Sequence, residues 1–70
     1  MTLVKAPISG TVFEVSVKEG DVVTVGQTLI ILESMKMEIP CEAEVAGTVT
    51  KIHVTEGDFI DEESVLVELA

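Results

Sequence analysis

The sequence predicts an all-β domain, a sandwich or flattened barrel of about eight short strands with an internal pseudo-two-fold axis. Val, Ile, Thr and Leu are abundant, and most apolar runs are short and interrupted by Gly, Pro or acidic residues. No stretch keeps helical spacing for more than about one turn. The second half of the chain also repeats the first, which indicates two similar half-domains that share one core.

Eight strands are expected in chain order. They cover Thr2–Ala6, Gly10–Val17, Val22–Val23, Thr28–Glu33, Met37–Glu42, Gly47–Val54, Phe59–Ile60 and Val65–Leu69. In the two longest segments, residues 10–17 and 47–54, the alternation of apolar residues shifts phase once, as it does at a β-bulge.

The repeat has an offset of 37 residues. Gly10-Thr11-Val12 recurs as Gly47-Thr48-Val49, and Glu19-Gly20-Asp21 recurs as Glu56-Gly57-Asp58. Two copies are too few for an open solenoid, so they favour a closed structure. In the two Glu-Gly-Asp segments, glycine permits a positive φ and the aspartate bonds the nearby backbone, which predicts turns rather than ion sites. The missing side chains of Gly10 and Gly47 permit a close backbone approach where the long strands begin.

Length and charge restrict the class of protein. The chain has 70 residues, enough for one domain spanning residues 1–70. It contains 13 acidic residues, four lysines and no arginine, for a net charge of −9. We therefore expect no nucleic-acid or membrane partner, because both need clustered basic residues. The hydrophobic fraction of 47% excludes a disordered acidic tail. No apolar run approaches a membrane span, and no signal peptide is expected.

Catalytic side chains are scarce. The chain has one histidine, one cysteine and no Tyr, Trp or Arg, and it lacks CxxC, HExxH and glycine-rich phosphate motifs. We expect no catalytic residue, no metal ligand and no enzyme activity of its own. Cys41 is unpaired, which favours a reducing compartment and a small buried strand residue. His53 is expected to be a surface strand residue.

The segment joining the two halves, Glu33-Ser34-Met35-Lys36-Met37-Glu38, is an unusual hairpin. A two-residue turn through Met35 and Lys36 requires backbone angles that ordinary residues disfavour. Exposed methionines at a tip gain nothing unless they meet a partner. From these residues alone, a plain surface lysine and a modified or docking lysine are equally supported.

These residues resemble the attachment motif of the biotinyl/lipoyl domain family, specifically the biotin carboxyl carrier type with Met35-Lys36-Met37. The resemblance covers almost the whole chain and includes Ala6-Pro7-Ile8-Ser9-Gly10 and both Glu-Gly-Asp turns. It implies two four-stranded antiparallel sheets with the modified lysine on a hairpin at one end. The halves align without a gap from residue 6 to residue 33, so the extra "thumb" loop of some carriers is not expected. A stand-alone carrier and a domain cut from a longer subunit both remain open.

The resemblance assigns covalent biotin to Lys36 and recognition by a biotin protein ligase to Met35 and Met37. It implies a carrier that shuttles CO2 between a biotin carboxylase and a carboxyltransferase, in the cytoplasm or, for a piece of a larger eukaryotic carboxylase, in the mitochondrial matrix. Lipoyl domains usually have Asp-Lys-Ala at the tip, yet Glu33-Ser34 keeps a lipoyl or dual carrier open as an alternative. A third reading is an unmodified β-domain used for assembly.

Overall fold

The computed structural model describes all 70 residues and consists of strands and turns, without any helix that could span a membrane. Its strands are β1 (Thr2–Lys5), β2 (Gly10–Val15), β3 (Val22–Val23), β4 (Thr28–Ser34), β5 (Met37–Glu42), β6 (Gly47–Ile52), β7 (Phe59–Ile60) and β8 (Val65–Leu69). All eight predicted strands are present. The bounds of β3, β5, β7 and β8 were predicted correctly, and the others differ by one or two residues at one end.

The strands form two four-stranded antiparallel sheets, which confirms the predicted fold class. One sheet has the order β1-β8-β6-β3 and the other the order β5-β4-β2-β7. The repeat relates the sheets to each other, because β1 to β4 correspond to β5 to β8. Only β4 and β5 are neighbours both in sequence and in a sheet. Every other strand pair joins strands that are not consecutive in the chain.

The core lies between the sheets and is entirely apolar. Fifteen hydrophobic residues are buried and no polar or charged residue is. The largest fully buried side chains include the equivalent pairs Leu29/Leu66 and Leu32/Leu69, so each half contributes matching residues. A shared core built in this way lets two short segments bury surface that neither could bury alone.

Both predicted bulges are present, at equivalent positions. In β2, Val12 pairs with Leu32 and Glu14 with Ile31, so Phe13 is the extra residue. In β6 the extra residue is Thr50. A bulge turns two successive side chains toward the same face of a sheet.

The predicted extensions of β2 to Val17 and of β6 to Val54 were wrong. After Val15 the ladder ends, and the Ser16 amide still donates to the Leu29 carbonyl oxygen at 2.9 Å. The chain then turns so that Val17 is buried in the core instead of extending the strand. The same bond recurs from the His53 amide to the Leu66 carbonyl oxygen, also at 2.9 Å.

The two Glu-Gly-Asp segments are turns, as predicted. Asp21 Oδ2 accepts a hydrogen bond from the Lys18 amide at 3.0 Å, and Asp58 Oδ2 accepts one from the Thr55 amide at 2.9 Å. The central glycines of the two segments, Gly20 and Gly57, have φ values of 96° and 95°. Turn geometry therefore accounts for these aspartates.

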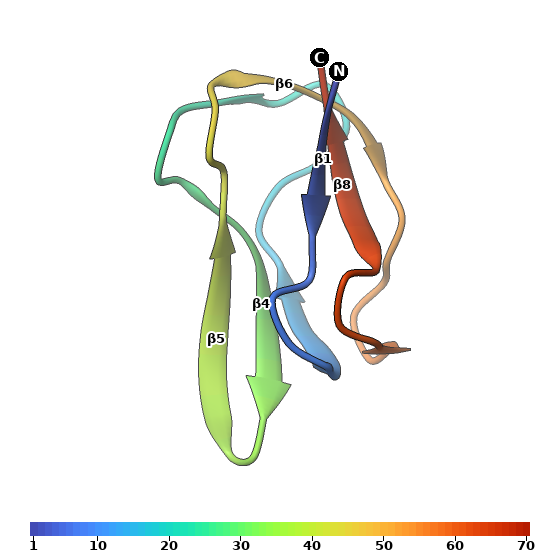
Figure 1. The fold of residues 1–70 in the computed structure, drawn as a ribbon. Coiled ribbons are helices and arrows are strands. Elements are labelled where there is room, and N and C mark those ends of the chain that lie inside the picture. The colour runs from blue at the N-terminus through green and yellow to red at the C-terminus, as the bar shows by residue number, and fades with distance from the viewer.

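The molecule is elongated, with principal extents of 31 × 19 × 18 Å. Figure 1 shows the β4–β5 hairpin extending beyond the rest of the barrel at one end, while the first and last residues lie side by side at the other. Strands β1 and β8 pair with each other beginning at Thr2 and Leu69, and this pairing keeps the first and last residues of the chain close together.

Candidate functional site

The tip of the β4–β5 hairpin is a two-residue turn in a strained conformation. Met35 and Lys36 have φ values of 53° and 65°, and the last strand pair below them is Ser34 with Met37. Positive φ at both central residues defines a type I′ turn, which Asn-Gly normally occupies. Non-glycine residues in this region cost about 1–2 kcal/mol each. The predicted strain at Met35 and Lys36 is therefore confirmed.

The tip extends beyond the body because its neighbouring strand stops short. Strand β2 accompanies β4 only as far as the pair Thr11–Glu33. Beyond that row, Ser34 and Met37 pair only with each other. The hairpin end consequently projects into solvent, as Figure 1 shows.

Gly10 anchors the base of this projection. A Cβ atom added at Gly10 would lie 2.7 Å from the carbonyl oxygen of Glu33, closer than real Cβ atoms come. The backbones of β2 and β4 can approach this closely only because Gly10 has no side chain. The prediction of a close backbone approach at Gly10 is confirmed, and Gly47 repeats it against the Ala70 carbonyl oxygen at 2.5 Å.

The side chains at the tip are available to a partner. Met35 is 87% exposed, Met37 is 59% exposed, and Lys36 is exposed. The Lys36 amine has no hydrogen bond or carboxylate partner, since the sole ion pair in the molecule joins His53 and Glu68. An unpaired primary amine at a projecting turn fits a group attached through an amide bond.

The other lysines are placed differently. Lys5 lies on β1, Lys51 on β6, and Lys18 in the turn after β2. None of these three is at the tip of a hairpin. The structure thus distinguishes Lys36 from them by backbone geometry alone.

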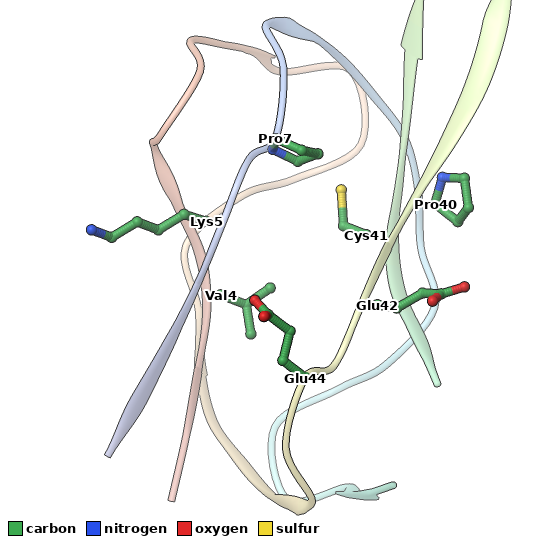
Figure 2. Close-up of a pocket in the computed structure, with 7 residues that line it drawn as sticks. All are labelled: Val4, Lys5, Pro7, Pro40, Cys41, Glu42 and Glu44. Atoms are coloured by element: carbon green, nitrogen blue, oxygen red, sulfur yellow. The ribbon is translucent and has the colours of Figure 1, made fainter. Parts of the chain in front are cut away.

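A shallow hollow of about 280 Å³ lies between the edge strands β1 and β5. It is lined by Val4, Lys5, Pro7, Pro40, Cys41, Glu42 and Glu44. In Figure 2 the Cys41 sulfur lies between the rings of Pro7 and Pro40, while the Lys5 side chain points away from it. Burial raises the pKa of the Cys41 thiol, so the thiol keeps its proton and is a poor nucleophile. Cys41 is a small buried strand residue, as predicted.

His53 does not approach Cys41. It is exposed as expected, but the prediction that it lies on a strand was wrong, because β6 ends at Ile52. Its Nε2 lies 2.5 Å from Glu68 Oε2. No group of three His, Cys, Asp or Glu side chains is arranged to hold a metal ion.

All three residues singled out by the sequence, Met35, Lys36 and Met37, meet at this tip. Sequence reasoning missed two exposed aromatic side chains, Phe13 and Phe59, which are 48% and 70% exposed. The internal repeat could have shown that these two aromatic residues are unusual, because the equivalent positions in the other half hold Thr50 and Val22.

Comparison with known proteins places the chain in a family. A family model described as "Biotin-requiring enzyme", for biotin and lipoyl attachment, matches residues 2–69. The chain is 46% identical over 67 residues to a biotin/lipoyl attachment protein of Bacillus subtilis (strain 168), covering 96% of this chain and 92% of that protein. It is 57% identical over 35 residues to the methylmalonyl-CoA carboxyltransferase 1.3S subunit of Propionibacterium freudenreichii subsp. shermanii, covering half of this chain and 28% of that one.

Solved structures agree with the fold. The urea carboxylase of Kluyveromyces lactis contains a region with a TM-score of 0.93 and 28% identity, which covers 99% of this chain and 6% of that chain. A single-chain, multi-domain long-chain acyl-CoA carboxylase matches with a TM-score of 0.89 and 32% identity, again over 6% of its length. This chain corresponds to one small part of those enzymes. With the family model matching nearly every residue, the chain belongs to the biotin/lipoyl attachment domain family.

Proposed function

We propose that this domain is a biotin carboxyl carrier, with biotin joined by an amide bond to Lys36. The observation that carries the proposal is the unpaired Lys36 amine at the tip of a projecting, strained turn between two exposed methionines. The domain has no catalytic role of its own. It presents one amine, and later the group attached to it, to separate enzymes.

The hairpin supports this role by holding Lys36 in a fixed place. Strands β4 and β5 pair without interruption from Leu32–Ile39 to Ser34–Met37, directly below the turn. Sites built on paired strands are placed more accurately than sites on loops. The Lys36 amine must lose a proton before it attacks an activated biotin. The partner ligase supplies that base, because no titratable side chain of this chain contacts the amine.

Met35 and Met37 are proposed as recognition residues for the biotin protein ligase. Their side chains are flexible, apolar and exposed on both sides of Lys36. Methionine surfaces of this kind suit docking because they adapt to the shape of a partner.

The further partners are a biotin carboxylase and a carboxyltransferase. Biotin, when bound, supplies a carrier for CO2. Attachment to Lys36 raises its effective concentration at both enzymes. The relatives support this assignment, because they include a subunit of a methylmalonyl-CoA carboxyltransferase and a region of a urea carboxylase. We place the domain in the cytoplasm or the mitochondrial matrix, where a free thiol such as Cys41 persists.

Intact mass after co-expression with a biotin ligase tests the proposal. The wild type should gain the mass of one biotin, and Lys36→Ala should gain none. Lys51→Ala, which removes an exposed strand lysine, is the matched control and should be modified like the wild type. A wild type that remains unmodified by an active ligase would refute the proposal.

A lipoyl or dual carrier is the second candidate. It is supported by the Bacillus subtilis relative, whose name gives both groups. Under this reading, Met35→Asp with Met37→Ala should increase lipoylation by a lipoate ligase, again measured by mass. If the ligase modifies neither version, this candidate is excluded.

A further inference from the structure

The side chains that peroxides oxidise are unevenly placed in this molecule. The main targets are the sulfur atoms of methionine and cysteine, and the chain has three methionines and one cysteine. Two of the methionines, Met35 and Met37, stand directly before and after Lys36. The third, Met1, lies at the opposite end of the molecule (Figure 1). Two of the four sulfur atoms therefore flank the one residue proposed for attachment.

Cys41 does not compete with these methionines for an oxidant. It is buried, and its sulfur lies between the rings of Pro7 and Pro40 (Figure 2). Burial also raises the pKa of its thiol, and the thiolate is the form that reacts with peroxides. The sulfur atoms that an oxidant meets first are consequently those of the methionines.

The hairpin keeps the sulfur atoms of Met35 and Met37 in contact with solvent. Strand β2 pairs with β4 only as far as Thr11–Glu33, so no third strand lies beside the end of the hairpin. Both methionines are exposed, Met35 more than Met37, and neither belongs to the hydrophobic core. Their oxidation therefore needs no local unfolding and leaves the core intact.

Oxidation changes the surface around Lys36 without changing its amine. Hydrogen peroxide removes two electrons from a thioether sulfur: an S–O bond forms, the O–O bond breaks, and the second oxygen leaves as water. A flexible apolar side chain thus becomes a polar one. A partner surface that covers the new oxygen without donating a hydrogen bond leaves it unsatisfied, which weakens binding.

We propose that Met35 and Met37 are a reversible oxidation site that controls whether Lys36 can be biotinylated. This inference rests on the proposed function, in which both side chains are recognition residues for the biotin protein ligase. A ligase surface that fits two apolar side chains loses that fit when either sulfur gains an oxygen. Methionine sulfoxide reductases, one for each sulfoxide epimer, restore the thioether. Peroxide therefore keeps the domain without biotin until these sulfur atoms are reduced.

Biotinylation of the oxidised domain by a purified biotin ligase tests the proposal. The domain is oxidised before it carries biotin, which has a thioether sulfur of its own, and hydrogen peroxide is removed before the ligase is added. The initial rate at a low domain concentration, followed by intact mass, should fall about tenfold after oxidation. Treatment with both reductases should restore the rate. The urea midpoint should be the same before and after oxidation; a lower midpoint would assign the loss to instability and overturn the proposal.

Met35→Leu with Met37→Leu is the matched variant, because leucine is similar in volume to methionine and has no sulfur. Whatever rate this variant has, peroxide should not change it, although Met1 is as exposed as Met35 and is still oxidised. An equal loss in the variant would overturn the proposal, because a residue outside the turn would then be responsible.

The wild-type measurements decide the proposal even if the variant is a poor substrate. Oxidised wild type that is biotinylated at the untreated rate would show that this inference alone is wrong. A loss that the reductases do not reverse would also overturn it. Untreated wild type that accepts no biotin would overturn the proposed function and this inference together.

Discussion

The two ends of the barrel are equivalent in the repeat, yet they differ in how their strands are joined. At one end, β4 continues into β5 through Met35 and Lys36. At the other end, β8 and β1, the equivalents of β4 and β5, pair side by side and bring the first and last residues together (Figure 1). The strand framework at both ends is the same. What distinguishes the hairpin end is therefore the turn, not the scaffold that supports it.

The shared scaffold extends to the close contacts beneath each end. Gly10 meets the Glu33 carbonyl and Gly47 meets the Ala70 carbonyl in the same way. Two residues of the turn, by contrast, have no equivalent in the other half. Stability and the proposed attachment consequently depend on different residues, so substitutions should separate the two properties.

The largest expected effect concerns the core, where the two ends should respond alike. Leu32→Ala and Leu69→Ala each remove a fully buried side chain at equivalent positions. Each should lower the free energy of unfolding by about 2–5 kcal/mol, measured by urea denaturation. If either variant is unfolded, Leu→Val at the same position gives a smaller loss to compare. Markedly unequal losses would show that the core is not symmetric.

Alanine substitutions of Gly10 and Gly47, which lie beneath the two ends of the barrel, should lower stability by different amounts. Gly10→Ala forces a Cβ against the carbonyl of Glu33, which is paired on both sides, with Thr11 and Glu38. It should destabilise by about 1–3 kcal/mol. Gly47→Ala meets Ala70, which lies beyond β8 and bonds only Thr48. We expect a smaller loss there in the same urea titration; a larger loss at Gly47 would contradict this account.

Replacing the two residues of the turn should make the domain more stable but should remove the lysine proposed for attachment. Met35→Asn with Lys36→Gly supplies the residues that a type I′ turn favours. Relief of the positive φ strain, offset in part by the extra chain entropy that a glycine loses on folding, should raise the free energy of unfolding by about 1 kcal/mol. Lys51→Gly, in the middle of β6, is the matched control and should lower it by about 0.5–1 kcal/mol. No gain in the double variant would mean that the turn is not strained in solution.

A smaller effect is expected at another mismatch between the halves. Glu63 has a φ of 72°, and its equivalent is Gly26 with a φ of 87°. Glu63→Gly should raise the free energy of unfolding by about 0.5 kcal/mol in thermal or urea unfolding. Gly26→Ala should lower it by about 1 kcal/mol. Glu62→Gly, next in sequence but without a positive φ, should give no gain; stabilisation there would argue against relief of strain.

The smallest effect is the pH dependence from Cys41. Burial raises the pKa of this thiol in the folded state, whereas the unfolded thiol ionises near its ordinary value of 9.0. The contribution to stability is therefore complete below pH 9.0 and is lost as the pH rises above it. Urea titrations at a series of alkaline pH values should show this decline. Cys41→Val, which copies the equivalent Val4, should weaken it, and an identical decline in that variant would assign it to other groups.

Most of the fold could be predicted from the sequence because the internal repeat gives two independent indications of each strand boundary, one in each half. Gly10 and Gly47, and the two Glu-Gly-Asp turns, mark the same boundaries in each half. The ends of β2 and β6 were predicted too long, since Val17 and Val54 continue the apolar pattern but enter the core from a turn. Apolar alternation does not distinguish a buried turn residue from a strand residue.

The site was predictable to a similar degree. The absence of Asn and Gly at Met35-Lys36 pointed to strain, and the positive φ values agree. The exposure of Phe13 and Phe59 was not predictable, because it depends on the bulge and on the shortness of β7. An aromatic residue in a strand is usually buried, and only the sheet order places these two on an outer face.

One feature of the topology bears on how the molecule assembles. The β4–β5 hairpin is the only strand pair whose members are adjacent in sequence. Pairing β4 with β5 costs far less chain entropy than pairing β1 with β8, because β1 and β8 lie at opposite ends of the chain. We expect the hairpin to form early in folding and the pairing of β1 with β8 to limit the overall rate. The strands that present Lys36 would then be ordered before the barrel closes behind them.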